Sequence, residues 1–322
     1  MKALFAFYNE IEEWQRLGPE FPGIDFVFAP DLQSFSGEIA DTDILFILSP
    51  MYEKPIADIV NAKALKLKWI QATTVGVDNI LLYGVPDGVI VSKAAGIFDV
   101  NVAEQAMALL LALLRQVAES AVDRAGAEYK RDLRWDKTRS LERKNVGVVG
   151  YGGIGKQLCR RLKAFDTRVL VYDVINVAEN EYVDEFFEDE SFAEFLSGCD
   201  IVFLSLPLTK DNVYMFNKET FGLMKEGGIL VNVSRGKLVN ENDLADALES
   251  GRIAGACLDV FEEEPLQKGS RLWGLDNVVM SPHLGGQGEY NNERLAELFK
   301  VNIGRFVNGE HMMYVVDENS AF

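Results

Sequence analysis

Short apolar runs alternate with amphipathic, helix-length segments in the first hundred residues. The runs predict strands at residues 3–7, 25–28, 44–48, 69–73 and 89–92. A helix is expected over residues 56–64, opened by Pro55, since proline is tolerated in a first helical turn. Strands separated by helix-length segments form βαβ units, so this part of the chain predicts a parallel sheet.

A second and stronger alternation begins at Val146. Its strands are expected at residues 146–149, 169–172, 201–206, 229–233, 256–260 and 278–280. Their nearly continuous apolar character is typical of strands buried on both faces of a parallel sheet. Helical spacing covers residues 154–165, 218–225 and 241–250, and Asn240 is a plausible N-cap for the last of these. The acidic stretch 179–190 is interpreted as a solvated face.

The segment between the two alternations predicts a long helix and then a surface connection. Residues 101–118 are apolar on more than one helical face, which indicates a helix buried at a domain junction or by a second subunit. Residues 119–145 are polar and are expected to connect the halves at the surface. Residues after Tyr290 look helical, and their pattern leaves open which half they join. The chain is therefore two α/β units, the second beginning near residue 100.

Composition narrows the classes of partner. The 322 residues suffice for about two domains. The formal net charge is −18, from 32 basic and 50 acidic residues, so nucleic acid and anionic membranes are poor partners. The longest uninterrupted apolar run of the predicted long helix, residues 106–114, is shorter than the roughly 20 residues of a membrane span.

The three cysteines and the N-terminus point to a cytoplasmic protein. Cys159, Cys199 and Cys257 are widely separated in apolar stretches, which favours reduced core thiols over a disulfide framework, and no metal-ligand spacing is present. The N-terminus becomes acidic too soon for a signal peptide. We therefore expect no metal and a cytoplasmic location.

A glycine-rich turn predicts a dinucleotide site. Residues 150–155 read G-Y-G-G-I-G between an expected strand and an expected helix, and Asp173 ends the next strand. Gly150 allows the tight turn, Gly152 allows close approach of a pyrophosphate, and Gly155 allows close helix–strand packing. The helix N-terminus favours the anion, while Asp173 suits ribose hydroxyls and repels a 2′-phosphate. A purely structural turn is the alternative.

Three further strand ends carry candidate chemistry. His283 follows the strand at 278–280, Arg235 follows the strand at 229–233, and an acidic run ending at Glu264 follows the strand at 256–260. Open α/β sheets bind ligands at the carboxyl ends of their strands. An imidazole there suits acid–base catalysis, a guanidinium suits a carboxylate, and a carboxylate beside the imidazole favours its protonated form. Each of these residues also has a purely structural interpretation. His283 could be hydrogen-bonded within the fold, Arg235 could cap a helix, and the acidic run could simply face solvent.

Four motifs in fixed order carry a resemblance. They are residues 150–155, Val-Ser-Arg-Gly at 233–236, Asp-Val-Phe-x-x-Glu-Pro at 259–265, and Ser-Pro-His-x-Gly-Gly at 281–286. Together they resemble the D-isomer-specific 2-hydroxyacid dehydrogenase family. Residues 74–78, 101–104 and 223–228 match as well. The resemblance covers nearly the whole chain and is specific for the family, but it is weak for the substrate.

The resemblance implies an α/β fold of two Rossmann-like domains. Each has a mainly parallel sheet, and the active site lies in the cleft between them. Residues 1–98 with 290–322 would form the substrate domain, and residues 99–289 the NAD-binding domain. The family also implies a homodimer, formed partly through the helix after Asn101.

The resemblance also assigns roles to individual residues. Arg235 would bind the substrate's carboxylate and carbonyl, His283 would be the general acid–base, and Glu264 would be its partner. Asp259 would lie near the nicotinamide, with Asp173 on the ribose. Further cofactor contacts would come from Gly150, Gly152, Gly153, Ile154, Gly155, Pro207, Val233, Ser234, Arg235, His283, Gly285 and Gly286. Substrate contacts would include Val75, Gly76 and Tyr52.

The implied reaction is the reversible reduction of a 2-oxo acid by NADH to the D-2-hydroxy acid. In the resembling family the loop after the third strand borders the substrate pocket. Here that loop, residues 49–52, carries Met51 and Tyr52 and no charge for a phosphate, so we expect glyoxylate, hydroxypyruvate or an apolar homologue. The alternatives are an NAD-sensing, corepressor-like binding protein and a phosphoglycerate-type dehydrogenase. A formate dehydrogenase is a third alternative. Formate dehydrogenases resemble this family but have Gln at the position of Glu264, so Glu264 argues against this alternative.

Overall fold

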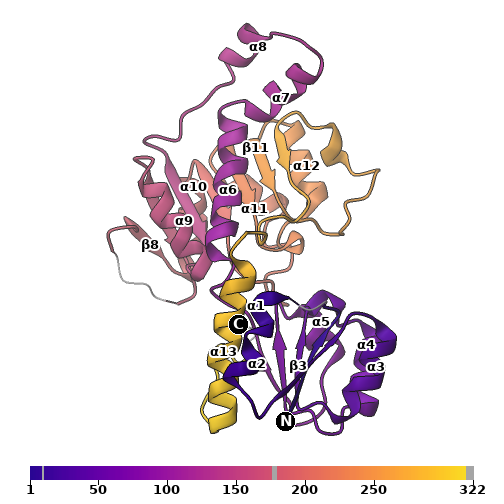
Figure 1. The fold of residues 1–322 in the computed structure, drawn as a ribbon. Coiled ribbons are helices and arrows are strands. Elements are labelled where there is room, and N and C mark those ends of the chain that lie inside the picture. Colours follow the sequence, from indigo (N-terminus) through magenta and orange to yellow (C-terminus); the bar gives the residue numbers. More distant parts are fainter. Residues whose placement is uncertain (9–10, 176–179, 317–322) are drawn as a thin grey trace. The chain divides into compact units, whose positions relative to one another are not determined.

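The computed structural model describes residues 1–8, 11–175 and 180–316. The chain forms two compact units, one of Met1–Phe98 with Gly288–Phe322 and one of Asp99–Gln287 (Figure 1). Each unit has its own sheet, and we describe each by itself.

The first unit contains a five-stranded sheet in which every named pair is parallel. The strand order is β2-β1-β3-β4-β5, so it reverses between β1 and β3. The five predicted strands are confirmed to within two residues at each end, as β1 (Lys2–Ala6), β2 (Asp25–Ala29), β3 (Ile44–Ile47), β4 (Trp69–Ala72) and β5 (Ile90–Ser92).

The helices of the first unit include several that the sequence pattern did not predict. The expected helix after Glu53 is α4 (Lys54–Lys63), with Pro55 in its first turn. The missed helices are short, and α3 (Leu32–Glu38) begins with a capping box between Asp31 and Ser34. The others are α1 (Glu12–Gln15), α2 (Leu17–Glu20) and α5 (Asp78–Tyr83), with 3₁₀ turns η1 (Ile39–Asp41) and η2 (Ser49–Met51).

The C-terminal helix α13 (Asn291–Asn308) belongs to the first unit. Phe299 on α13 lies in one core cluster with Phe5 and Phe46 of the sheet, and the ring centroids of Phe46 and Phe299 are 4.8 Å apart. The buried Asn302 adds polar contacts, donating from Nδ2 to Gln71 Oε1 at 3.0 Å. The structure thus answers the question that the sequence pattern left open.

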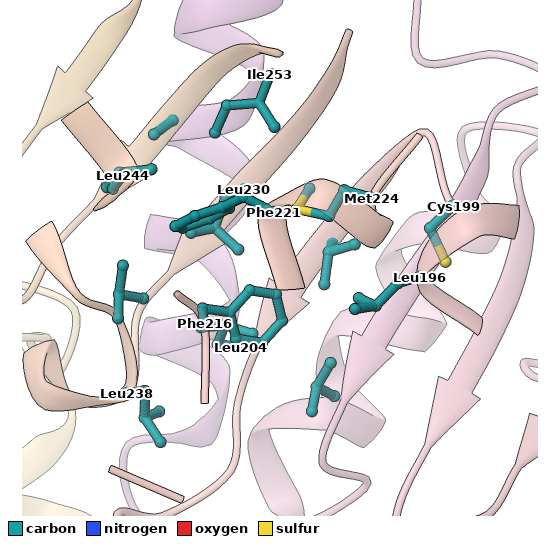
Figure 2. Packing of buried hydrophobic residues seen from close by; sticks show 14 of the residues in the cluster. Leu196, Cys199, Leu204, Phe216, Phe221, Met224, Leu230, Leu238, Leu244 and Ile253 are labelled. Carbon is teal, nitrogen blue, oxygen red and sulfur yellow. The ribbon is translucent and has the colours of Figure 1, made fainter. Parts of the chain in front are cut away.

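The second unit contains a seven-stranded sheet with the order β12-β11-β10-β9-β6-β7-β8 and parallel pairing throughout. Its order reverses between β6 and β9. Six strands were predicted and are confirmed with shifts of up to three residues, as β6 (Asn145–Val149), β7 (Arg168–Tyr172), β9 (Ile201–Leu204), β10 (Gly228–Asn232), β11 (Ile253–Leu258) and β12 (Val278–Met280). Leu204 and Leu230 of the sheet lie in one core cluster with Phe221 (Figure 2).

The edge strand β8 (Glu185–Phe187) corrects the interpretation of 179–190 as a solvated face. Phe187 is buried and pairs with Tyr172 on β7. The acidic residues around this strand hid it, because three residues are too few to show an apolar run. Residue 179 itself lies outside the described residues.

The long helix and the connection after it also differ from the prediction. Helix α6 (Asp99–Leu114) ends early because Gln116 takes a left-handed conformation with φ 58°. The stretch 119–145, predicted as a surface connection, is partly helical, since it contains most of α7 (Val117–Ala125) and all of α8 (Arg131–Trp135). The side chain of Leu113 on α6 touches β11, where a Cβ on Gly255 would stand 2.8 Å from it.

The remaining helices of this unit agree with the predicted pattern or fill gaps in it. The predicted helices are α9 (Gly153–Lys163), α11 (Lys218–Leu223) and α12 (Glu241–Glu249), and Asn240 caps α12 through the N–H groups of Asn242 and Asp243. Elements without a prediction are α10 (Phe192–Gly198) and the 3₁₀ turns η3 (Asp189–Ser191), η4 (Gly236–Leu238) and η5 (Arg271–Gly274).

Two properties of the described residues bear on the expected partners. All three cysteines are free and buried, and burial raises the pKa of the Cys159 and Cys199 thiols to about 12. Among the described helices none alone is long and apolar enough to span a membrane, although α6 and α7, bent by 67°, meet that test as a pair.

Candidate active site

The candidate residues of the second unit follow the carboxyl ends of six parallel strands. Because these strands run in one direction, their ends lie at one edge of the sheet. The segments there are Gly150 after β6, Asp173 after β7, Pro207 after β9, Val233 to Arg235 after β10, Asp259 after β11 and His283 after β12. The fold therefore brings these residues to one edge, as the motif order suggested.

The glycine-rich turn between β6 and α9 leaves no room for a side chain at three of its positions, Gly150, Gly153 and Gly155. Gly150 has φ +95°, and a Cβ there would stand 2.9 Å from the backbone N of Leu206. A Cβ on Gly155 would stand 2.1 Å from the carbonyl oxygen of Gly150. Gly152 is the N-cap of α9 and has open space where its Cβ would be. The first N–H groups of α9, among them that of Ile154, are thus left for a ligand, which fits a pyrophosphate.

Asp173 is held at the end of β7 by two backbone N–H groups. Its Oδ2 accepts from Tyr151 at 2.6 Å and its Oδ1 from Ile175 at 3.0 Å. The carboxylate therefore lies directly beside the glycine-rich turn. The next two side chains, Val174 and Ile175, are exposed and apolar.

Asp259 organises the loop that carries the histidine. The side chain is 1% exposed, and its Oδ1 accepts from Ser281 Oγ at 2.6 Å and from Leu284 N at 2.9 Å. Its Oδ2 accepts from Gly285 N at 2.7 Å. The family resemblance placed Asp259 near the nicotinamide, but the sequence did not predict these three hydrogen bonds. It also missed Gln105 on α6, which donates from Nε2 to Ser281 Oγ at 2.8 Å.

His283 and Glu264 form a close pair. Nδ1 of His283 lies 2.6 Å from Oε2 of Glu264, whose Oε1 accepts from Phe261 N at 3.0 Å. The backbone of His283 adopts φ +53°, a conformation that is unusual for a residue with a Cβ. The backbone N–H of His283 donates to the carbonyl oxygen of Asp259 at 2.8 Å. With Nδ1 engaged by the carboxylate, Nε2 is the nitrogen that can exchange a proton with a substrate.

Electrostatics favours the charged state of this pair. The hydrogen bond that His283 donates to Glu264 raises the pKa of His283, against the opposing effects of burial and of Arg235. Burial would raise the pKa of Glu264, but hydrogen bonds from His283 and Phe261 outweigh it and lower that pKa. The imidazolium therefore persists to higher pH than it would in a free histidine.

Arg235 is fixed by the strand end before it. Buried Asn232 accepts from Ser234 N at 3.1 Å and donates from Nδ2 to Arg235 O at 2.9 Å. A Cβ on Gly236 would stand 1.8 Å from the carbonyl carbon of Phe261, so the turn after Arg235 packs on the backbone that leads to Glu264. Asn232 was also missed, since its role depends on a turn that the sequence pattern does not show.

The other predicted cofactor residues lie at the same edge. Ser234 Oγ donates to the carbonyl oxygen of Leu206, which ties the ends of β9 and β10 together. Val233 and Gly285 are buried, Gly286 is half-buried, and Pro207 is exposed. Pro207 also accepts at its carbonyl oxygen from Asn212 Nδ2 at 2.8 Å.

The predicted substrate residues of the first unit follow the strands β3 and β4. Val75 and Gly76 lie half-buried in the loop after β4, where Thr74 Oγ1 donates to Gly76 O at 2.7 Å. Tyr52 is 0% exposed and its hydroxyl donates to Gly84 O at 2.9 Å. Its ring packs in the core and its hydroxyl is hydrogen-bonded there, and the contact of Tyr52 with substrate stays a prediction.

The described residues contain no group of three or more His, Cys, Asp or Glu side chains that could hold a metal ion.

Comparison with known proteins identifies the family. Residues 107–285 match the model of the D-isomer specific 2-hydroxyacid dehydrogenase, NAD binding domain, which lies within the second unit and covers more than half of the chain. The chain belongs to the D-isomer specific 2-hydroxyacid dehydrogenase family. It is thus an NAD(P)-dependent oxidoreductase that acts on CH–OH groups.

Individual relatives extend over most of the chain. It is 37% identical over 281 residues to a glyoxylate reductase of Pyrococcus furiosus, covering 85% of this chain and 82% of the relative. A family member from Aeromonas salmonicida superposes with TM-score 0.85 at 27% identity, over 98% of this chain and 99% of that one. An NADPH-dependent glyoxylate/hydroxypyruvate reductase of Sinorhizobium meliloti, solved with NADP and sulfate, gives TM-score 0.82 at 26% identity over both whole chains.

Replacing Glu264 with Gln should lower the pKa of His283, because the substitution removes the hydrogen-bonded charge that raises it. The measurement is a pH titration of the imidazole signals by NMR, in which exposed His311 serves as the internal reference. Glu263→Gln, one residue away and exposed, is the control and should leave the titration unchanged. A His283 titration that is the same in Glu264→Gln and in the parent protein would contradict the pairing.

Proposed function

We propose that this dehydrogenase uses NADH to reduce an unphosphorylated 2-oxo acid to the D-2-hydroxy acid, and catalyses the reverse reaction. The observation that carries the proposal is the 2.6 Å pair of His283 and Glu264 at the sheet edge that also holds the uncapped start of α9. The names of the relatives supply the substrate class, since they include glyoxylate and hydroxypyruvate reductases.

The cofactor would be held by the second unit. The N–H groups at the start of α9 and the open space at Gly152 would receive the pyrophosphate, and Asp173 would accept from the ribose hydroxyls. When bound, the nicotinamide supplies the hydride to the substrate's C2.

Side chains of this protein would bind the substrate, stabilise its negative charge and transfer the proton. Arg235 binds the substrate's carboxylate with its planar fork of donors and stabilises negative charge on the carbonyl oxygen. Protonated His283 donates the proton from Nε2 to that oxygen, while Glu264 holds the ring at Nδ1 and stabilises the imidazolium. In the reverse direction neutral His283 accepts the proton. Val75 and Gly76 stay in the proposal as backbone donors to the carboxylate, on the family resemblance.

We also propose that the protein is a cytoplasmic homodimer, with α7 and α8 in the interface. Their segment exposes large apolar side chains, among them Val122, Tyr129 and Trp135. Arg134 ties α8 to α7 through two hydrogen bonds to Asp123, at 2.8 and 2.9 Å, so this surface is held in shape. Exposed apolar patches on an ordered surface mark interaction sites.

Light scattering tests the dimer. We expect twice the chain mass for the parent protein and the mass of a single chain for the double variant Tyr129→Glu, Trp135→Glu, since buried unpaired carboxylates are costly at an interface. Leu65→Glu, at an exposed apolar position of the first unit, is the control and should stay dimeric. A monomeric parent would refute the proposed dimer.

His283→Asn should lower kcat by about 10² to 10⁴, the usual contribution of general acid–base catalysis, while NADH affinity changes little. Steady-state kinetics with a 2-oxo acid and NADH fluorescence titrations measure the two quantities. His311→Asn is the matched control, since His311 is exposed and is the chain's other histidine. Equal turnover in His283→Asn and the parent would remove His283 from the mechanism.

NADH should be preferred over NADPH in kcat/KM, although the structural relative from Sinorhizobium meliloti is NADPH-dependent. The reason is that Asp173 places a carboxylate beside the turn, followed by two apolar side chains, and a 2′-phosphate would be repelled there. Asp173→Ala should narrow the preference. Equal use of both cofactors by the parent protein would show that Asp173 does not select between them.

Hydroxypyruvate should be a better substrate than phosphohydroxypyruvate, which separates this proposal from a phosphoglycerate-type activity. In the loop 49–52, Tyr52 is buried and Met51 is exposed and uncharged, so the loop offers no cation to a phosphate. The kcat/KM values of the two compounds, measured side by side with NADH, decide between them. A higher value for the phosphorylated compound would overturn the substrate proposal, and activity with neither, nor with glyoxylate, would favour an NAD-sensing role.

A further inference from the structure

The carboxyl group of Asp99 lies against the start of α9. Asp99 is the first residue of α6, and its Oδ2 lies 1.8 Å from the point where a Cβ on Gly153 would stand. Gly153 is the first residue of α9. No residue with a Cβ fits at position 153 while Asp99 keeps this place, so the two residues are fitted to each other although 54 positions separate them.

This end of α9 is where a dinucleotide's pyrophosphate would bind. Gly152 at the N-cap has no side chain to accept from the helix, and the first turn of α9 contains no acidic residue of its own. The carboxyl group beside it comes from α6 instead. A helix N-terminus attracts one anion, and a second anion at the same end is repelled by the first.

The surroundings of Asp99 favour its neutral form more than water does. Burial raises the pKa of Asp99, and the cation that opposes this effect is Lys156 on α9. One turn or more further along the two helices, Glu104 of α6 and Arg161 of α9 neutralise each other in a 3.1 Å ion pair.

We propose that Asp99 competes with the pyrophosphate for the N-terminus of α9 and thereby weakens the binding of the dinucleotide. The inference rests on the proposed cofactor site and concerns its affinity. Binding then requires that Asp99 take up a proton or turn away from Gly153. The residue acts as a built-in limit on cofactor affinity, and cofactor binding becomes coupled to proton uptake.

Equilibrium titrations with ADP-ribose test the proposal. This probe carries the pyrophosphate and lacks the nicotinamide, so the ionisation of His283 does not enter the result. Asp99→Asn keeps the shape and removes the charge, and it should bind ADP-ribose about three- to thirtyfold more tightly at neutral pH. Glu104→Gln removes one charge from the exposed part of the same helix and is the control, with binding unchanged.

The pH dependence provides a readout that a merely structural role would not change. The affinity of the parent protein for ADP-ribose should rise as pH falls toward the pKa of Asp99, and that rise should be lost in Asp99→Asn. Equal or weaker binding by Asp99→Asn at neutral pH would overturn the proposal. If the parent protein binds neither ADP-ribose nor NADH, the proposed cofactor site itself fails, which is a different result.

The contact with Gly153 can be tested without any ligand. Gly153→Ala should lower the melting temperature, since its Cβ overlaps the Asp99 carboxyl group. Adding Asp99→Ala should restore much of the loss, because the overlapping atoms are gone. An equal melting temperature for Gly153→Ala and the parent would show that the two side chains do not compete for this space.

Discussion

Parallel pairing of the seven strands in the second unit is the constraint on which the proposed chemistry depends. Six of these strands end in candidate residues, and parallel pairing carries all six ends to one edge of the sheet. In an antiparallel sheet, alternate strands would end at the opposite edge. The switch in strand order between β6 and β9 lies beside the glycine-rich turn, where open α/β sheets leave room for a ligand.

Buried polar side chains hold the loops at these strand ends in a defined conformation. Asp259 accepts three hydrogen bonds from the loop after β12, and Asn232 shapes the turn that carries Arg235. With this support His283 holds a left-handed backbone conformation, a cost that a flexible loop would not sustain. The pair with Glu264 thus rests on groups that never need to touch a substrate.

The sequence predicted those features that depend on local pattern. Continuous apolar runs located eleven strands, and motif spacing located the glycine-rich turn, Arg235, Glu264 and His283. The edge strand β8 was missed because it is short and acidic, and the break after α6 because it depends on one residue, Gln116, with a positive φ. For Tyr52 the pattern shows an aromatic residue in a loop but not that its ring packs inward.

Contacts between distant segments were beyond the reach of the sequence. Three examples are the hydrogen bonds of Asp259 to the loop after β12, the hydrogen bond from Gln105 to Ser281, and the close packing of Asp99 against Gly153. Each joins residues that no local periodicity connects. The contacts of Asp259 follow from the pairing of β11 with β12, and those of Gln105 and Asp99 follow from how α6 packs on the sheet and on α9. They are also the ones that set the finer properties of the site, above all the pKa of its ionisable groups and its affinity for an anion.

The origin of the new C–H bond tests the central claim most directly. Hydroxypyruvate is incubated with the protein and NADH deuterated at the transferred position of C4, and the product is analysed by mass spectrometry and by chiral chromatography. The account predicts a D-configured 2-hydroxy acid with one deuterium at C2, since the hydride comes from the cofactor and only the hydroxyl proton from His283. An L-configured product, or a product without deuterium at C2, would contradict it.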